Sequence, residues 1–286
     1  MDYKTQTIEQ LFRTIVPLKS KKDRSKSLSD LLVIPDYSKS FLLGLRDRYS
    51  KVVMESVSIV TCTRKPDLIN NVLKNYREQV WAKKELIIIL NRDDMDINKW
   101  RKETEKDNNI FIYQLPEETS LGHCYNFAVE KVNYDYIATF DDDDYYAPNY
   151  LTDLMYAFLY TDADIVGKRA YYAYLEAQRL FVLRHAAEEY TYIEGDLFLD
   201  GGKKIMKRKV FDHVQYRDVS NLEDIYICQD SMQKGFKIFS ADKYNLVYLR
   251  KANKDNHTWK GEDDIILRWL CTVIAHTDHY KNRVTI

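Results

Sequence analysis

The stretch YIATFDDDDYYAP, residues 136–148, decides the prediction of the fold. Its first five residues are β-prone and predict a strand, so four aspartates follow directly at the end of that strand. Four adjacent carboxylates repel one another, and a folded chain keeps them together where water or a cation reduces the repulsion. In open α/β sheets, ligands bind at the carboxyl ends of the strands. The stretch therefore indicates a site for a hard divalent cation, Mg²⁺ or Mn²⁺, shared with a phosphorylated substrate.

A solvated acidic turn is the competing interpretation of residues 141–144, which we name the acid tetrad. The strand before the tetrad and Pro148 after it disfavour that interpretation, because together they place the acids between two regular elements. A ligand site is therefore the favoured reading of the tetrad.

The composition narrows the class of protein. The chain has 286 residues, enough for one large domain or two small ones. Its 43 basic and 44 acidic residues create no field that would recruit nucleic acid. It contains no apolar run near the ~20 residues of a membrane span, and its first residues lack a signal-peptide pattern. We therefore expect a cytoplasmic protein that binds no nucleic acid, with contact to the inner face of the membrane limited to peripheral binding.

Alternating apolar segments predict an α/β domain over residues 55–260. Strands are expected at 57–61, 85–90, 110–113 and 136–140, and helices at 66–76, 121–132 and 148–158. The strand at 85–90 is apolar throughout, as a strand buried on both faces should be. A strand, a helix and a second strand in succession give a right-handed crossover, which favours a mostly parallel sheet between two layers of helices.

The two ends of the chain differ from this central part. Residues 1–54 hold apolar residues at helical spacing and a basic linker, and predict an accessory helical extension that packs on the main domain or on a partner. Residues 264–275 are strongly apolar, so we expect residues 261–286 to hold an amphipathic helix and a tail packed on the domain. Residues 168–195 show no clear pattern and are treated as loops.

Five elements in order resemble the family 2 glycosyltransferases of the GT-A fold. They are the segment 57–67 (VSIVTCTRKPD), the Leu121-Gly122 pair with Asn126, the tetrad with Pro148, the Gly201-Gly202 loop followed by Glu223-Asp224 and residues 235–238, and residues 256–259 (NHTW). One departure is the run Asn91-Arg92-Asp93-Asp94, where family members often have Asp-Asp-Gly-Ser. The resemblance covers residues 55–260 and implies a three-layer α/β sandwich.

The resemblance also implies a reaction and its residues. The reaction is transfer of a hexose-type sugar from a nucleoside diphosphate to a glycan or lipid-linked acceptor, with inversion, in the synthesis of a surface or cell-wall polysaccharide. The implied metal ligands for Mn²⁺ or Mg²⁺ are Asp143, Asp141 and His257. Asp224 matches the general base, and Glu223 contacts the acceptor. The implied nucleotide-sugar contacts are Thr61, Thr63, Arg64, Asp67, Asn91, Asn126, Asp141, Asp142, Gly201 and Gly202.

Purely structural or solvent-exposed roles remain open for some of these residues. Glu223-Asp224 also suits the first turn of a helix over residues 225–234, where acids are favoured. Asn126 lies mid-helix, where its propensity is poor, so contact with a ligand and simple exposure are both open. The lysines at 203, 204 and 207 supply positive charge or are merely solvated.

Two other functions fit part of the pattern. A nucleotidyltransferase also combines a sheet, acids and a metal, but it more often carries a glycine- and lysine-rich loop after the first strand, and residues 61–67 contain no glycine. A non-catalytic module could use the acids for a structural cation, although Asp224 and His257 argue against it. Thermal stabilisation by metal alone, without any nucleotide effect, would identify such a module.

Overall fold

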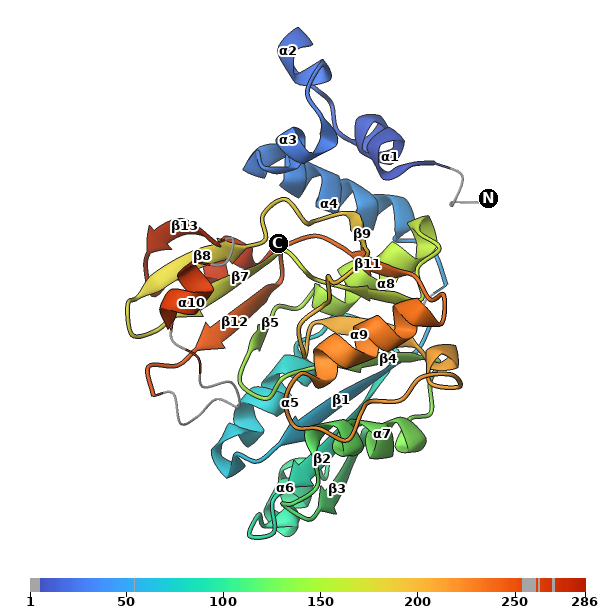
Figure 1. Ribbon diagram of the computed structural model, residues 1–286, viewed down its shortest axis with the longest axis vertical. Coiled ribbons are helices and arrows are strands. Elements are labelled where there is room, and N and C mark those ends of the chain that lie inside the picture. Colours follow the sequence, from blue (N-terminus) through green and yellow to red (C-terminus); the bar gives the residue numbers. More distant parts are fainter. Residues whose placement is uncertain (1–5, 54, 254–260, 262, 269–270) are drawn as a thin grey trace.

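The computed structural model describes residues 6–53, 55–253, 261, 263–268 and 271–286 (Figure 1). Within them, a central sheet has the strand order β3-β2-β1-β4-β10-β6-β11-β9. All of its strands run in one direction except β9 and β10, which are antiparallel to their neighbours. The strands are β1 (Val57–Thr63), β2 (Lys84–Asn91), β3 (Ile110–Leu115), β4 (Tyr136–Thr139), β6 (Ile165–Gly167), β9 (Thr191–Ile193), β10 (Lys204–Lys207) and β11 (Ile238–Ser240).

Helices cover both faces of this sheet because its inner strands are apolar on both sides. In β1, for example, Ile59 belongs to one buried cluster and Val60 to the other. The first cluster includes α5 (Ile69–Arg77), α6 (Ile97–Glu103) and α8 (Tyr150–Tyr160), and the second includes α7 (Leu121–Lys131) and α9 (Glu223–Gln233). The predicted three-layer α/β sandwich is thereby confirmed, as are the four strands and three helices expected between residues 57 and 158.

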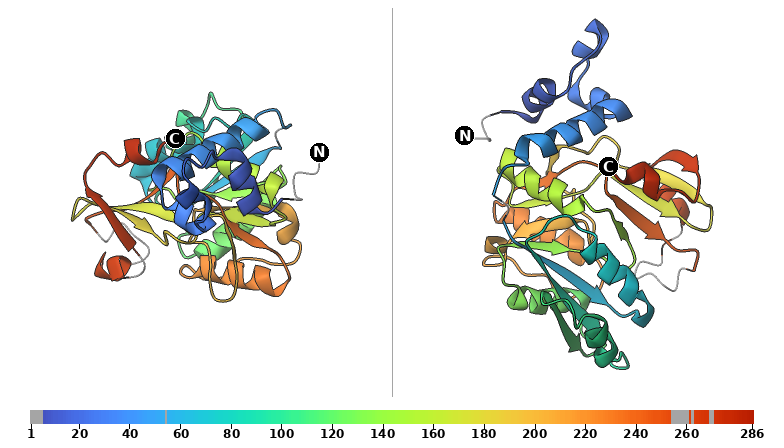
Figure 2. Two further views of the ribbon diagram at one scale, coloured as in Figure 1. Left: turned by 90° about the horizontal axis from the view of Figure 1, so that it is seen from above. Right: turned by 180° about the vertical axis from the view of Figure 1, so that it is seen from behind.

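A second sheet has the order β13-β8-β7-β12-β5 and lies beside the main one (Figures 1 and 2). Its strands are β5 (Tyr145–Tyr146), β7 (Tyr171–Leu175), β8 (Leu180–Arg184), β12 (Leu246–Arg250) and β13 (Cys271–His276). The treatment of residues 168–195 as loops was wrong, since β7 and β8 form an antiparallel hairpin there and β9 follows. The tyrosine-rich β7 is buried along its whole length, which hides the alternation that marks a half-exposed strand.

The end of the chain also differs from the prediction. The helix expected over residues 264–275 stops early, because α10 spans Asp263–Arg268 and β13 follows at Cys271–His276. The β-branched residues Thr272, Val273 and Ile274 favour a strand, and β13 pairs with the edge of β8. A short helix, α11 (Lys281–Val284), then packs near β12.

The extension at the start of the chain is helical, as predicted, and it packs on the main domain. It holds α1 (Ile8–Ile15), α2 (Lys21–Arg24), α3 (Leu28–Leu32) and α4 (Pro35–Tyr49), which lie at one end of the molecule (Figure 2). Arg46 on α4 donates to both oxygens of the buried Asp153 on α8, at 2.7 and 2.9 Å. Ser38 and Tyr244 share a buried hydrogen bond of 2.7 Å, and Phe41 lies in the same apolar cluster as the sheet.

Candidate functional site

The acid tetrad follows β4 at the carboxyl edge of the main sheet, where the sequence places it. Its side chains differ in exposure along the bend at residues 142–144. The side chains of Asp141 and Asp143 are 30% and 15% exposed, while Asp142 and Asp144 are buried. Asp141 and Asp143 are therefore the carboxylates of the tetrad that are open to a ligand, whereas Asp142 and Asp144 are enclosed in the fold.

Two lysines offset part of the negative charge of the tetrad from opposite sides. The ammonium of Lys65, just after β1, lies 2.7 Å from Asp143 Oδ2 and 3.2 Å from Asp142 Oδ1. The ammonium of Lys203, just before β10, lies 3.5 Å from Asp141 Oδ2 and 3.4 Å from Asp144 Oδ2. These contacts explain how four adjacent carboxylates stay together in a folded chain.

The buried Asp142 and Asp144 are tied to neighbouring elements. The hydroxyl of Thr63 donates to Asp142 Oδ2 at 2.6 Å, and the backbone N–H of Leu249 on β12 donates to Asp144 Oδ1 at 2.9 Å. Asn75 donates to the carbonyl of Asp144 at 2.9 Å. Burial raises the pKa of Asp142 to about 6 and that of Asp144 to about 8. Their contacts brace the tetrad against β1, α5 and the second sheet.

The glycine pair brings the tetrad and the second acidic cluster together. Gly202 has φ +64°, and a Cβ atom there would lie 2.3 Å from Cγ of Asp141, so only glycine fits. A Cβ atom on Gly201 would lie 3.6 Å from Glu223 Oε1, 3.9 Å from Asp224 Oδ2 and 4.0 Å from Asp141 Oδ1. Three carboxylates from two distant parts of the sequence thus surround one glycine.

The second cluster, Glu223 and Asp224, opens α9. The carboxylate of Asp224 accepts the backbone N–H of Gly201 at 2.9 Å and that of Ile225 at 2.8 Å, one on each oxygen. Burial raises the pKa of Asp224, and burial together with the charge of Asp224 raises the pKa of Glu223 to about 7. Leu222, immediately before them, adopts the left-handed conformation with φ +67°, which is strained for leucine and turns the chain into the helix.

The residues at the ends of β1 and β2 gather at the same edge of the sheet. The guanidinium of Arg64 donates to the carbonyl of Asn91 at 3.0 Å and to that of Glu117. Thr61 is buried within β1, and Asp67 is exposed in the first turn that follows. Arg64 and Asp67 can reach a ligand at this edge, whereas Thr61 contributes to the floor beneath it.

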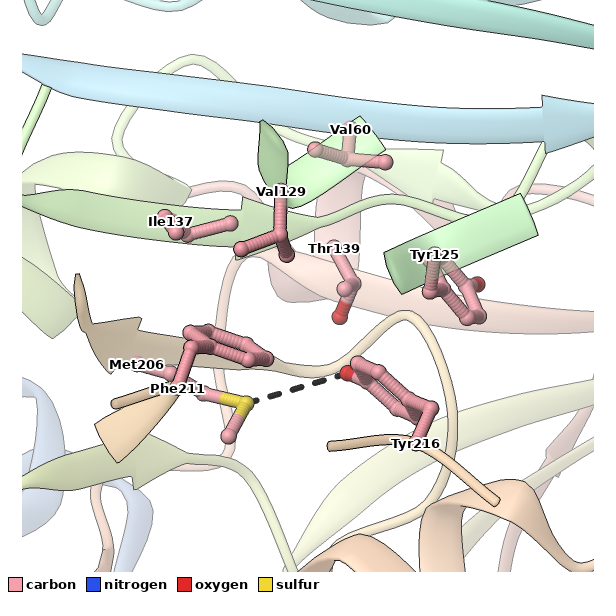
Figure 3. A pocket seen from close by; sticks show the side chains of 8 residues that line it. All are labelled: Val60, Tyr125, Val129, Ile137, Thr139, Met206, Phe211 and Tyr216. Atoms are coloured by element: carbon pink, nitrogen blue, oxygen red, sulfur yellow. Dashed lines mark hydrogen bonds between the residues drawn. The ribbon is translucent and has the colours of Figure 1, made fainter. Parts of the chain in front are cut away.

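Asn126 has a structural task that the sequence did not reveal. Its side-chain amide donates to the carbonyl of Tyr216 at 2.8 Å and accepts the N–H of Tyr216 at 2.9 Å, so both of its ends are engaged. The ring of Tyr216 then packs between α7 and the sheet, where its hydroxyl contacts Met206 Sδ at 3.7 Å (Figure 3). The apolar gap that these side chains line has no room for a water molecule. Asn126 is thus neither simply exposed nor free to contact a ligand.

The lysines of the glycine loop are buried, contrary to the solvated alternative. Lys203 and Lys204 are 3% and 1% exposed, and the ammonium of Lys204 donates to the carbonyls of Leu199 and Asp200. The ammonium of Lys207 lies farther along β10 and donates to the carbonyl of Ala163. Sequence reasoning missed the pairing of Lys65 and Lys203 with the tetrad; an acidic run that needs counter-ions was the available signal.

The donor set fits a divalent cation. His257 lies outside the described residues, and within the described part of the chain no three His, Cys, Asp and Glu side chains converge as a metal cage. Mg²⁺ and Mn²⁺ need no such cage, because one or two carboxylates and the phosphates of a substrate hold them. The part-exposed carboxylates of Asp141 and Asp143 supply hard oxygen ligands, and the missing side chain of Gly202 leaves Asp141 room beside the backbone.

A wide surface groove lies elsewhere. It has a volume of about 600 Å³ and is lined by Tyr192, Phe236 and Lys237, among others, at the amino ends of β6 and β11. The acids lie beyond the carboxyl end of β4, which is the opposite edge of the same sheet. The groove is therefore separate from the acidic site.

Comparison with known proteins identifies the family. Residues 56–215, more than half of the chain, match the model of glycosyl transferase family 2. The chain belongs to glycosyl transferase family 2. The O-antigen biosynthesis glycosyltransferase WbnJ of Escherichia coli is 32% identical over 118 residues, which are 40% of this chain and 46% of that protein. The resemblance predicted from five sequence elements is thereby confirmed.

Solved structures show the same fold in other glycosyltransferases. The mannosyltransferase PcManGT of Pyrobaculum calidifontis, in complex with GDP-Man and Mn²⁺, has a TM-score of 0.55 at 15% identity, covering 79% of this chain and 70% of that one. TarS 1-349 of S. aureus, in complex with UDP-GlcNAc, has a TM-score of 0.52 at 13% identity, covering 74% and 64%. The family 2 chain has the GT-A fold of these neighbours, and it spans less than two thirds of the length of WbnJ and TarS 1-349. None of its described helices is both long and apolar enough to cross a bilayer.

Proposed function

We propose that this family 2 glycosyltransferase transfers a hexose-type sugar from a nucleoside diphosphate to an acceptor hydroxyl, with inversion and with a divalent cation, in surface or cell-wall polysaccharide synthesis. The observation that carries the proposal is the meeting of Asp141, Glu223 and Asp224 around Gly201. It sets a cluster suited to a metal beside a cluster suited to accept a proton. The relative WbnJ acts in O-antigen biosynthesis, which supports a glycan or lipid-linked acceptor.

Asp143 and Asp141 would hold the cation, which when bound neutralises the charge that develops on the leaving diphosphate. The residues at the ends of β1 and β2, together with Gly201 and Gly202, form the surrounding donor site. Backbone N–H groups fix the carboxylate of Asp224 and leave a lone pair on each of its oxygens. Asp224 is therefore held in one orientation toward the acceptor.

Asp224 is the proposed general base. The acceptor hydroxyl gives its proton to Asp224 while its oxygen forms the new bond to the anomeric carbon. The bond from that carbon to the diphosphate oxygen breaks on the opposite side, which inverts the configuration. Glu223, buried beside Asp224, orients the acceptor.

The test begins with thermal unfolding of the protein in the presence of UDP, GDP, CDP and dTDP, each with and without Mn²⁺. We expect a rise in Tm that requires both Mn²⁺ and one particular nucleotide, of about 5 °C at a hundredfold excess over Kd. In the variant Asp143→Asn the Mn²⁺-dependent part of that rise should vanish. Stabilisation by Mn²⁺ alone, with none by any nucleotide, would instead establish a non-catalytic metal-binding module.

A further inference from the structure

The contacts of Lys65 conflict with the metal site proposed above. Its ammonium lies 2.7 Å from Asp143 Oδ2, the oxygen that a cation on Asp143 would share or approach. Two positive charges a few ångströms apart repel strongly in a partly buried site. The ammonium and a divalent cation therefore compete for the same carboxylate.

We propose that Lys65 is an exchangeable counter-ion of Asp142 and Asp143, which a divalent cation displaces and which then pairs with the diphosphate of the donor. The proposal rests on the proposed function, because it takes Asp143 as a metal ligand. It assigns Lys65 a positioning role that links cation binding to nucleotide binding.

The surroundings of Lys65 allow it to leave, whereas those of Lys203 do not. The side chain of Lys65 is 32% exposed and extends from the turn after β1, where Pro66 starts a short 3₁₀ helix, η2 (Pro66–Leu68). The side chain of Lys203 is 4% exposed, and its ammonium donates to the carbonyl of Gly201 at 2.9 Å. The ammonium of Lys203 also lies 5.2 Å from the ring centres of Tyr171 and Tyr248. Lys203 is therefore a fixed partner of the tetrad, and Lys65 is a partner of the tetrad that can move.

The departure of Lys65 leaves Asp142 supported. The hydroxyl of Thr63 donates to Asp142 Oδ2 at 2.6 Å, and Asn71 donates to the carbonyl of Asp142 at 2.8 Å. Asp142 therefore keeps its place when the ammonium moves. Asp143 would exchange the ammonium for the cation, so the number of positive partners around the tetrad is maintained.

The destination of the ammonium follows from its position in the chain. Lys65 stands at the carboxyl end of β1, the edge at which nucleotides bind in sheets of this kind. A lysine ammonium binds phosphate as a point charge on a flexible stem, so a short swing takes it from carboxylate to diphosphate. Cation and nucleotide would then each favour the binding of the other, because both require Lys65 to be off Asp143.

The experiment measures Mn²⁺ binding directly, from the electron paramagnetic resonance signal of free Mn²⁺. Wild type, Lys65→Met and Lys65→Gln are titrated with Mn²⁺, first without nucleotide and then with UDP and with GDP, and the Mn²⁺ bound by each nucleotide without protein is subtracted. Lys74→Met serves as the matched control, since Lys74 pairs with Glu78 on the exposed surface of α5 at 3.7 Å. Thermal melting shows that each variant is folded.

Without nucleotide, both Lys65 variants should bind Mn²⁺ about tenfold more tightly than wild type, because one competing charge has gone. Addition of nucleotide should tighten Mn²⁺ binding by a larger factor in wild type and in Lys74→Met than in the Lys65 variants, where only the direct contact of phosphate with Mn²⁺ contributes. Equal or weaker Mn²⁺ binding by both Lys65 variants without nucleotide would overturn the exchange.

The titration also separates this inference from the proposed function. If wild type binds Mn²⁺ in the presence of UDP or GDP while the Lys65 variants show no gain without nucleotide, only the exchange is wrong. If wild type binds Mn²⁺ under none of these conditions, the metal-dependent reaction is wrong and the exchange is wrong with it.

Discussion

The two acidic clusters of the site balance their charge in different ways. The tetrad at residues 141–144 is paired with the ammonium groups of Lys65 and Lys203. The carboxylate of Asp224, by contrast, is held by backbone N–H groups of Gly201 and Ile225. Both clusters lie at one edge of the sheet, and both consist of adjacent acids.

The difference shows how the same residue type can serve two kinds of chemistry. A lysine side chain can withdraw, so its carboxylate partner can take up a cation in its place. A backbone N–H cannot withdraw without unfolding the loop, so it fixes the direction of a carboxylate. Burial raises the pKa values of Glu223 and Asp224, as it does those of Asp142 and Asp144, so the two clusters differ in the partners of their carboxylates. The tetrad suits ligand exchange and the pair suits proton transfer.

The largest expected effect separates these two tasks. Asp224→Asn should lower the rate of sugar transfer by about a thousandfold, the range of a lost general base, because an amide cannot accept the acceptor's proton. It should lower the Tm rise with nucleotide and Mn²⁺ only slightly, since the amide oxygen of Asn still accepts one of the two backbone N–H groups of Gly201 and Ile225. Product formation and thermal unfolding, measured on the same preparation, check both statements. Full activity in Asp224→Asn would transfer the role of base to Glu223.

A smaller effect is expected on stability when Lys203, the buried lysine that pairs with the tetrad, is replaced. At pH 9, above the pKa of about 8 of Asp144, Lys203→Met should lower the free energy of unfolding by about 3 kcal/mol, because it leaves the buried, ionised Asp144 without its ion-pair partner. The matched control is Lys209→Met, since Lys209 is exposed and pairs at 2.7 Å with the buried Asp164, which keeps the ammonium of Lys207 at 3.4 Å; its cost should be under about 1 kcal/mol. Urea unfolding measures both. Equal costs for the two variants would mean that the tetrad does not depend on a buried ammonium.

The smallest expected effect is the change in protein stability with pH that Glu223 causes. Because the pKa of Glu223 is about 7 in the folded protein and lower when unfolded, the folded state holds this proton more tightly. The resulting stabilisation is complete below the unfolded pKa of Glu223 and is lost as the pH rises through about 7. Glu223→Gln should therefore stabilise the protein at pH 8 by about 2 kcal/mol more than at pH 5. Urea unfolding at both values checks this, with the exposed Glu194→Gln as control; an equal effect at both pH values would contradict it.

The sequence predicts those parts of the fold in which local pattern and tertiary environment agree. The strands β1 to β4 are apolar runs that end in polar clusters, so they and their carboxyl edge could be placed. The second sheet could not, because β5 is two residues long and β12 pairs with β7 from far along the chain. Such pairings depend on contacts that no local pattern encodes.

The same limit applies to the site. Glu223 and Asp224 could be placed at the start of a helix, and the structure puts them beside the tetrad. The sequence does not show which polar side chains are buried. In the sequence Lys203 is indistinguishable from a surface lysine, but in the structure it is buried beside the tetrad. Asn126 could be a ligand contact from the sequence, but in the structure it pairs with the backbone of Tyr216. Charge and polarity can be read from the sequence, whereas the partners of a polar group follow from tertiary structure.

The anchoring of α4 on α8 has a practical consequence for domain exchange. Arg46 compensates the buried carboxylate of Asp153, and Phe41 fills the same core as the sheet. A chimera that took residues 55–286 alone, without the helical extension, would uncover an ionised aspartate and a broad apolar face together. Swaps between relatives should therefore cut in front of α1, or carry a matching α4 with the catalytic sheet.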